Sequence, residues 1–130
     1  MTINGKERKF RYSVWASGKI AALTPDGNVN TVIKQLENDR FSGDALPKMA
    51  CIMNRAYEMW RKFKAQAEGE TYEPDCMEPE EVEILTVLET QELTKELIET
   101  MARDSVGEIQ TEPVKTKGKK TVKPGTEESD

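Results

Sequence analysis

The thirteen residues MTINGKERKFRYS, residues 1–13, decide the fold that this sequence predicts. Asn4 and Gly5 suit the two positions of a type I′ turn at which φ is positive, and charged and aromatic residues alternate after them. Such a turn sets three pairs of facing residues: Ile3 with Lys6, Thr2 with Glu7, and Met1 with Arg8. We therefore expect an N-terminal β-hairpin.

The predicted hairpin has one apolar and one charged face, because successive side chains of a strand point to opposite sides. The apolar face holds Met1, Ile3, Phe10 and Tyr12, and the charged face holds Thr2, Glu7, Lys9 and Arg11. Two strands alone are only marginally stable in water. The apolar face must therefore pack on helices of this chain or on another chain.

After the hairpin, apolar residues recur at helical spacing. Ser13 is a suitable N-cap residue for a helix over 14–23. Residues 24–28, Thr-Pro-Asp-Gly-Asn, are typical of a turn, because proline fixes φ and glycine allows a positive φ. A short helix over 29–36 follows. The side chains that we expect to be buried in these two helices are Ala16, Ile20, Leu23, Val29, Val32, Ile33 and Leu36.

The longest helix is predicted over residues 44–67, with Asp44 as its cap and Pro47 in its first turn. Its main apolar residues recur every three or four positions: Leu46, Met49, Met53, Ala56, Trp60, Phe63 and Ala67. Further apolar residues widen this stripe. We therefore expect a central helix that contacts other elements on more than one side.

An acidic connector over 68–80 precedes two further helical segments. Pro79 can begin a helix, because its missing N–H would lack a partner there in any case. Residues 80–88 fit either a helix or a strand, and the flanking glutamates favour a helix that ends near Thr90. The last helix is predicted over 91–103. The expected buried side chains are Val82, Leu85, Leu88, Leu93, Leu97, Ile98 and Met101.

From Ser105 onward the apolar pattern stops, and threonine, lysine, glycine, proline and glutamate dominate. This composition is typical of disorder. The sequence therefore predicts a mainly α (α+β) fold, with the hairpin packed on a small bundle of about five helices over residues 1–104. A disordered Lys/Pro/Glu-rich tail is expected over 105–130.

The net charge of −5 hides two blocks of opposite sign. Residues 1–67 have a balance of +6, residues 68–104 a balance of −11, and residues 105–130 a balance of zero. Opposite charges on the two halves of one small domain favour their docking, within one chain or between copies. A larger acidic block beside the basic one makes nucleic acid an unlikely main partner.

Residue chemistry excludes most enzyme classes. The chain has no histidine, its two cysteines lack a metal-ligand pattern, and no nucleotide-binding or hydrolase motif is present. We therefore expect no catalysis, no cofactor and no metal site. No apolar run approaches the roughly 20 residues of a membrane span, and the first residues lack the features of a signal peptide. The predicted location is the cytoplasm.

One group of side chains is suggestive of binding. Tyr57, Met59, Trp60 and Phe63 lie on a stripe that is too wide for a single neighbouring helix. Flexible thioethers beside aromatic rings suit an adaptable protein-binding groove. The same residues would also serve as ordinary core, and the pattern alone leaves both interpretations open.

The opening of the chain resembles a known family. Ile3-Asn-Gly-Lys-Glu, then Phe10-Arg-Tyr-Ser and a helix through Trp15, Ala16 and Ile20, is similar to the start of the tail assembly chaperones of long-tailed, siphovirus-like bacteriophages and prophages. The resemblance implies a non-enzymatic protein that binds the tape measure protein and helps to recruit tail tube subunits during virion morphogenesis in the bacterial cytoplasm. Self-association is also expected.

The alternative is a small regulatory or adaptor protein. It would bind nucleic acid or another protein through a basic hairpin face made of Lys6, Arg8, Lys9 and Arg11.

Overall fold

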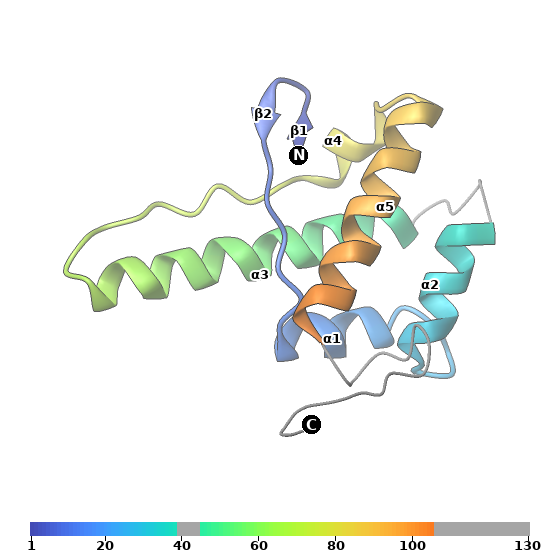
Figure 1. Cartoon of the computed structure of the whole chain (residues 1–130), viewed down its shortest axis with the longest axis horizontal. Helices are drawn as coiled ribbons and strands as arrows, with labels where there is room; N and C mark the ends of the chain where they lie inside the picture. Colours follow the sequence, from blue (N-terminus) through green and yellow to red (C-terminus); the bar gives the residue numbers. More distant parts are fainter. Residues whose placement is uncertain (39–44, 106–130) are drawn as a thin grey trace, which may run out of the picture.

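The computed structural model describes residues 1–38 and 45–105, and in these it is mainly helical with a small N-terminal hairpin (Figure 1). Its elements are β1 (Thr2–Ile3), β2 (Lys6–Glu7), α1 (Val14–Ala21), α2 (Val29–Asn38), α3 (Ala45–Ala67), α4 (Pro79–Glu83) and α5 (Val87–Asp104). The predicted fold class, a hairpin with about five helices, is confirmed for this part of the chain. The expected cap Asp44 and the tail beyond Ser105 lie outside the described residues.

The hairpin has the predicted turn and register. Asn4 and Gly5 have φ values of 53° and 81°, as a type I′ turn requires. The pairs are Thr2 with Glu7 and Ile3 with Lys6. On the apolar face, Ile3, Phe10 and Tyr12 are buried and Met1 is partly buried. The apolar face of the hairpin is therefore part of the core.

The two strands are short, and the chain beyond them is held by α3. The Arg11 N–H donates to the carbonyl of Met53 at 3.0 Å. Asn54, fully buried on α3, donates from Nδ2 to the carbonyl of Lys9 at 3.0 Å and accepts from the N–H of Met77 at 2.8 Å. One side chain thus joins the segment after the hairpin to the acidic connector.

Helix α1 and the turn after it follow the predicted signals. The Ser13 hydroxyl accepts a hydrogen bond from the N–H of Ala16, as an N-cap does. In the turn, Gly27 has a φ of 63°. The Asp26 carboxylate accepts from the hydroxyls of Thr31 and Thr24, each at 2.7 Å, and these bonds lower the pKa of Asp26. The turn is therefore built on an ionised carboxylate.

The central helix α3 packs against α1, α2, α4 and α5, as its wide apolar stripe predicts. The core lies along its first half, where Leu46, Met49, Met53 and Ala56 are buried. The second half projects from the bundle, and the connector returns beside it (Figure 1).

The predicted apolar stripe does not stay buried to the end of α3, because none of the helices in residues 1–38 and 45–105 lies beside that end (Figure 1). Phe63 is 66% exposed, and Ala67 is exposed as well. The returning connector covers a different face. There the buried Glu58 accepts from the hydroxyl of Tyr72 at 2.7 Å and from the N–H of Asp75 at 2.9 Å.

The prediction for residues 80–88 was wrong in its boundaries. Helix α4 ends at Glu83, and the break falls at residues 84–86 instead of near Thr90. Thr86 caps α5: its hydroxyl accepts from the N–H of Glu89 at 3.2 Å, and the Glu89 carboxylate accepts from the N–H of Thr86 at 2.9 Å. This reciprocal capping box places Leu88 in the first turn of α5. Leu88 was expected in the core but is 64% exposed.

The basic and acidic halves dock within one chain, as their charges predict. Arg8, only 4% exposed, donates from Nη2 to both carboxylate oxygens of Glu81, at 3.0 and 2.9 Å, and from Nε at 3.2 Å. It also donates to the carbonyl of Asp75. Lys6 forms an ion pair with the Asp75 carboxylate. The hairpin is thus fixed to the connector and to α4 by charge.

Candidate partner-binding surface

The four residues predicted to bind a partner all lie on the projecting half of α3, but the structure divides them into two groups. Tyr57, Met59 and Trp60 are partly buried, whereas Phe63 is largely exposed. Tyr57 and Trp60 contact each other, with ring centroids 5.6 Å apart and planes tilted by 50°. Met59 lies beside α1 instead.

Trp60 is surrounded by positive charge. The Arg11 guanidinium lies 4.6 Å from the centroid of its ring, and the Lys64 ammonium lies 5.6 Å from it. Cations at these distances are attracted to the negative face of an indole. Trp60 is therefore held in place by its own chain, and its contact with Arg11 had no signal in the local residue pattern.

Met59 lines a hollow of about 270 Å³ between α1 and α3. Trp15 and Arg55 line it as well, with Ser13 and Ala56 completing the set. The Arg55 guanidinium lies 5.8 Å from the centroid of the Trp15 ring. The hollow thus lies between α3 and the start of α1.

Trp15 extends this surface and Val14 precedes it on α1; both were missing from the predicted site. Val14 is 92% exposed and Trp15 is also exposed. A signal for Val14 was present, because it lies on the side of α1 opposite the buried Ala16 and Ile20. We call the whole set the aromatic surface; its members are Val14, Trp15, Tyr57, Met59, Trp60 and Phe63.

Positive charge borders the aromatic surface. Lys19 lies 6.0 Å from the Trp15 ring, and Arg11, Arg55 and Lys64 also lie against its tryptophans. The arrangement combines apolar area with cations. Its chemistry is suited to holding an apolar segment of another protein.

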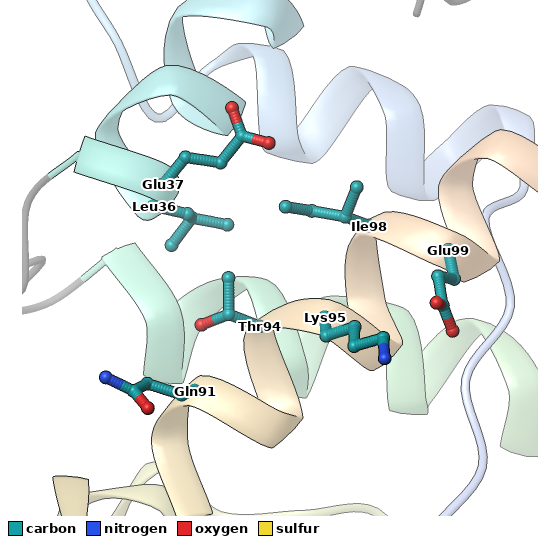
Figure 2. A pocket seen from close by; sticks show the side chains of 7 residues that line it. All are labelled: Leu36, Glu37, Gln91, Thr94, Lys95, Ile98 and Glu99. Atoms are coloured by element: carbon teal, nitrogen blue, oxygen red, sulfur yellow. The ribbon is translucent and has the colours of Figure 1, made fainter. Parts of the chain in front are cut away.

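A second hollow, of about 500 Å³, lies between α2 and α5. Figure 2 shows Leu36 and Ile98 extending toward the space between the helices, with Thr94 beside them. The remaining lining residues are polar: Glu37, Gln91, Lys95 and Glu99. This groove was not predicted, because Ile98 and Leu36 were both expected to be ordinary core.

The basic hairpin face of the alternative hypothesis does not form an open surface. Arg8 is buried against Glu81, and Lys6 is paired with Asp75. Arg11 lies over Trp60, so that only Lys9 stays exposed without such a contact among these four. The acidic half therefore occupies two of the four charges that would have bound a phosphate backbone, those of Arg8 and Lys6.

The two cysteines are poor nucleophiles. Burial, together with nearby glutamates including Glu81, raises the pKa of Cys51 to about 11. Burial also raises the pKa of Cys76. In residues 1–38 and 45–105, no three histidine, cysteine or acidic side chains are grouped as a metal site would require. None of the helices in these ranges is both long enough and apolar enough to span a membrane.

Comparisons with known proteins give no relative. No protein-family model matches the chain, and neither the curated proteins nor the solved structures contain a significant match.

Proposed function

We propose that this chain is a non-enzymatic tail assembly chaperone of a long-tailed bacteriophage or prophage. It binds the tape measure protein and helps to recruit tail tube subunits during virion morphogenesis in the cytoplasm of the bacterial host. The observation that carries the proposal is the aromatic surface, which displays apolar side chains on a projecting helix. The resemblance of the first twenty residues to this chaperone family supports it.

The physical basis is the need of a long helical client for temporary cover. A tape measure protein with an exposed apolar seam aggregates unless another protein shields that seam, and an apolar groove can shield it reversibly. Val14 at 92% and Phe63 at 66% exposure leave most of their apolar area available for such a contact. Met59 adds a side chain that adapts to different shapes.

The test is co-purification with the tape measure protein encoded in the same gene cluster, using Val14→Ser/Phe63→Ser as the binding variant. Both side chains are exposed, so the variant should fold normally. Each lost contact of about 50 to 100 Å² is worth roughly 1 to 2 kcal/mol at 25 cal/mol per Å². We expect binding to weaken at least tenfold.

The matched control is Gln35→Ser, which truncates an exposed, uncharged side chain of α2 that lines neither hollow. It should bind the tape measure protein as the parent chain does. Retention of full affinity by Val14→Ser/Phe63→Ser, or an equal loss in both variants, would show that the aromatic surface is not the binding site. Failure of the parent chain to bind would refute the proposed function itself.

A further inference from the structure

The α4–α5 corner exposes three aliphatic side chains within five residues. Ile84 and Val87 are each 70% exposed, and Leu88 is 64% exposed. The exposure of Val87 and Leu88 follows from the capping box at Thr86. This box starts α5 at Val87, so that both residues lie uncovered in its first turn. Water-exposed aliphatic side chains that gather in this way mark a contact site more often than scattered ones do.

This corner continues into the groove between α2 and α5. Residues three or four positions apart are neighbours on a helix surface, so Val87 and Leu88 adjoin Gln91, and Gln91 adjoins Thr94 and Lys95 of the groove. From Val87 to Ile98 the surface follows α5 for about 16 Å, or three helical turns. Leu36 of α2 forms the facing wall (Figure 2). We call this combined feature the acidic groove.

The charge around the acidic groove is negative. Glu37 and Glu99 line it, Glu83 ends α4 next to Ile84 of the corner, and Lys95 is the one basic side chain among its lining residues. The chain carries no lysine or arginine between Lys64 and Lys95. The charge around the aromatic surface has the opposite sign, because its tryptophans lie against lysines and arginines.

We propose that the acidic groove is a second docking surface, and that its occupant is a short apolar segment of a partner protein flanked by lysine or arginine residues. The hollow of about 500 Å³ has room for aliphatic side chains, and its negative border favours a positively charged partner over a neutral one. The same border repels phosphate groups, which excludes nucleic acid and anionic lipid headgroups as occupants. The proposal is independent of the proposed function, because it concerns a different surface.

The test is a selection from a random library of displayed 14-residue peptides on the full chain. Enriched peptides should carry a positive net charge and at least two aliphatic residues at helical spacing. The binding variant is Val87→Ser/Leu88→Ser, which keeps every charge and replaces two exposed side chains. We expect enriched peptides to bind this variant at least tenfold more weakly than the parent chain.

The matched control is Val14→Ser on the aromatic surface, which should leave the affinity of these peptides unchanged. Equal binding to Val87→Ser/Leu88→Ser and to the parent chain would show that charge alone attracts the peptides. This result would overturn the proposal. Enrichment of neutral or acidic peptides, or no enrichment, would overturn it too. Sedimentation velocity measures the oligomeric state. A parent chain that is a dimer and a Val87→Ser/Leu88→Ser variant that is a monomer would show that a second copy of this chain occupies the groove.

Because the two surfaces have separate variants, their outcomes are separable. Loss of tape measure binding in Val14→Ser/Phe63→Ser with unchanged peptide binding supports both assignments. A chain that binds the selected peptides but no tape measure protein would leave the acidic groove in place and refute the proposed function alone.

Discussion

Replacing Glu81 with glutamine tests the ion pair that fixes the hairpin to the acidic half. Arg8 is 4% exposed and donates three hydrogen bonds to the Glu81 carboxylate, between 2.9 and 3.2 Å. Glutamine keeps the acceptor for the N–H of Glu78, which the capping box of α4 needs. The substitution therefore removes the charge and leaves the cap in place.

The expected loss follows from the burial of the two partners. Removing one partner of a buried ion pair costs about 3 to 5 kcal/mol, because the other charge is left without compensation. The Glu81 side chain is 24% exposed, so water offsets part of this cost. We expect a loss of about 2 to 3 kcal/mol in the free energy of unfolding, which corresponds to a fall in Tm of roughly 10 to 20 °C for a domain of this size.

Urea denaturation followed by circular dichroism at neutral pH measures this loss. The matched control is Glu83→Gln, which neutralises an exposed carboxylate two residues further along the same short helix. It should change the free energy of unfolding by less than about 0.5 kcal/mol, as surface substitutions usually do. If Glu81→Gln is no more destabilising than Glu83→Gln, the ion pair does not hold the hairpin.

Three further predictions concern single side chains. Asn54→Leu should cost about 2 to 4 kcal/mol in urea denaturation, because it leaves the partly buried carbonyl of Lys9 and the buried N–H of Met77 without these partners; a loss below 1 kcal/mol would contradict this. Asp26 has a lowered pKa in the folded state, caused first by Thr31 and then by Thr24. The contribution of Asp26 to the free energy of unfolding is therefore present above the unfolded pKa of about 3.9. It is lost as the pH falls through the lower pKa of the folded state. Between pH 5 and pH 3, the Tm of the parent chain should fall further than that of Asp26→Asn, and equal falls would refute the role of Asp26. Cys51, with a pKa of about 11, should react with iodoacetamide at pH 8 on the order of a hundredfold more slowly in the folded chain than in urea; equal rates would show that its thiol is accessible and ordinary.

The local signals of the sequence predicted the hairpin and the helices because each depends on few residues. Asn4 and Gly5 specify a turn with two positive φ values whatever surrounds them, and the register follows from the turn. Ser13 and Pro79 mark helix starts by their own chemistry. The opposite charges of the two halves likewise predicted their docking, though not that Arg8 would be the buried partner.

The features that the sequence did not predict depend on contacts between distant segments. The stripe on α3 has the same spacing before and after Ala56, and only the path of the connector leaves Phe63 exposed. Asn54 stands among apolar residues without any local sign that it joins two backbone segments. The boundary at Thr86 did have a local signal, Thr-x-x-Glu, which outweighs the apolar run around it.

Four of the six residues of the aromatic surface were named from the sequence. Periodicity pointed to Tyr57, Met59, Trp60 and Phe63 because their stripe was wider than one neighbour could cover. It did not show that α1 would bring Trp15 to Met59, since that contact depends on the crossing of two helices. The acidic groove depends on the separation of α2 and α5, which no pattern within either helix specifies.

Hydrogen exchange of the chain bound to its tape measure protein tests the central claim most directly. Binding through the aromatic surface should slow the exchange of backbone amides at the start of α1 and in the projecting half of α3, around Phe63. Amides of the hairpin turn and of α4 should exchange as they do in the unbound chain. A stable complex in which protection falls elsewhere, with none around Val14 and Phe63, would contradict the account.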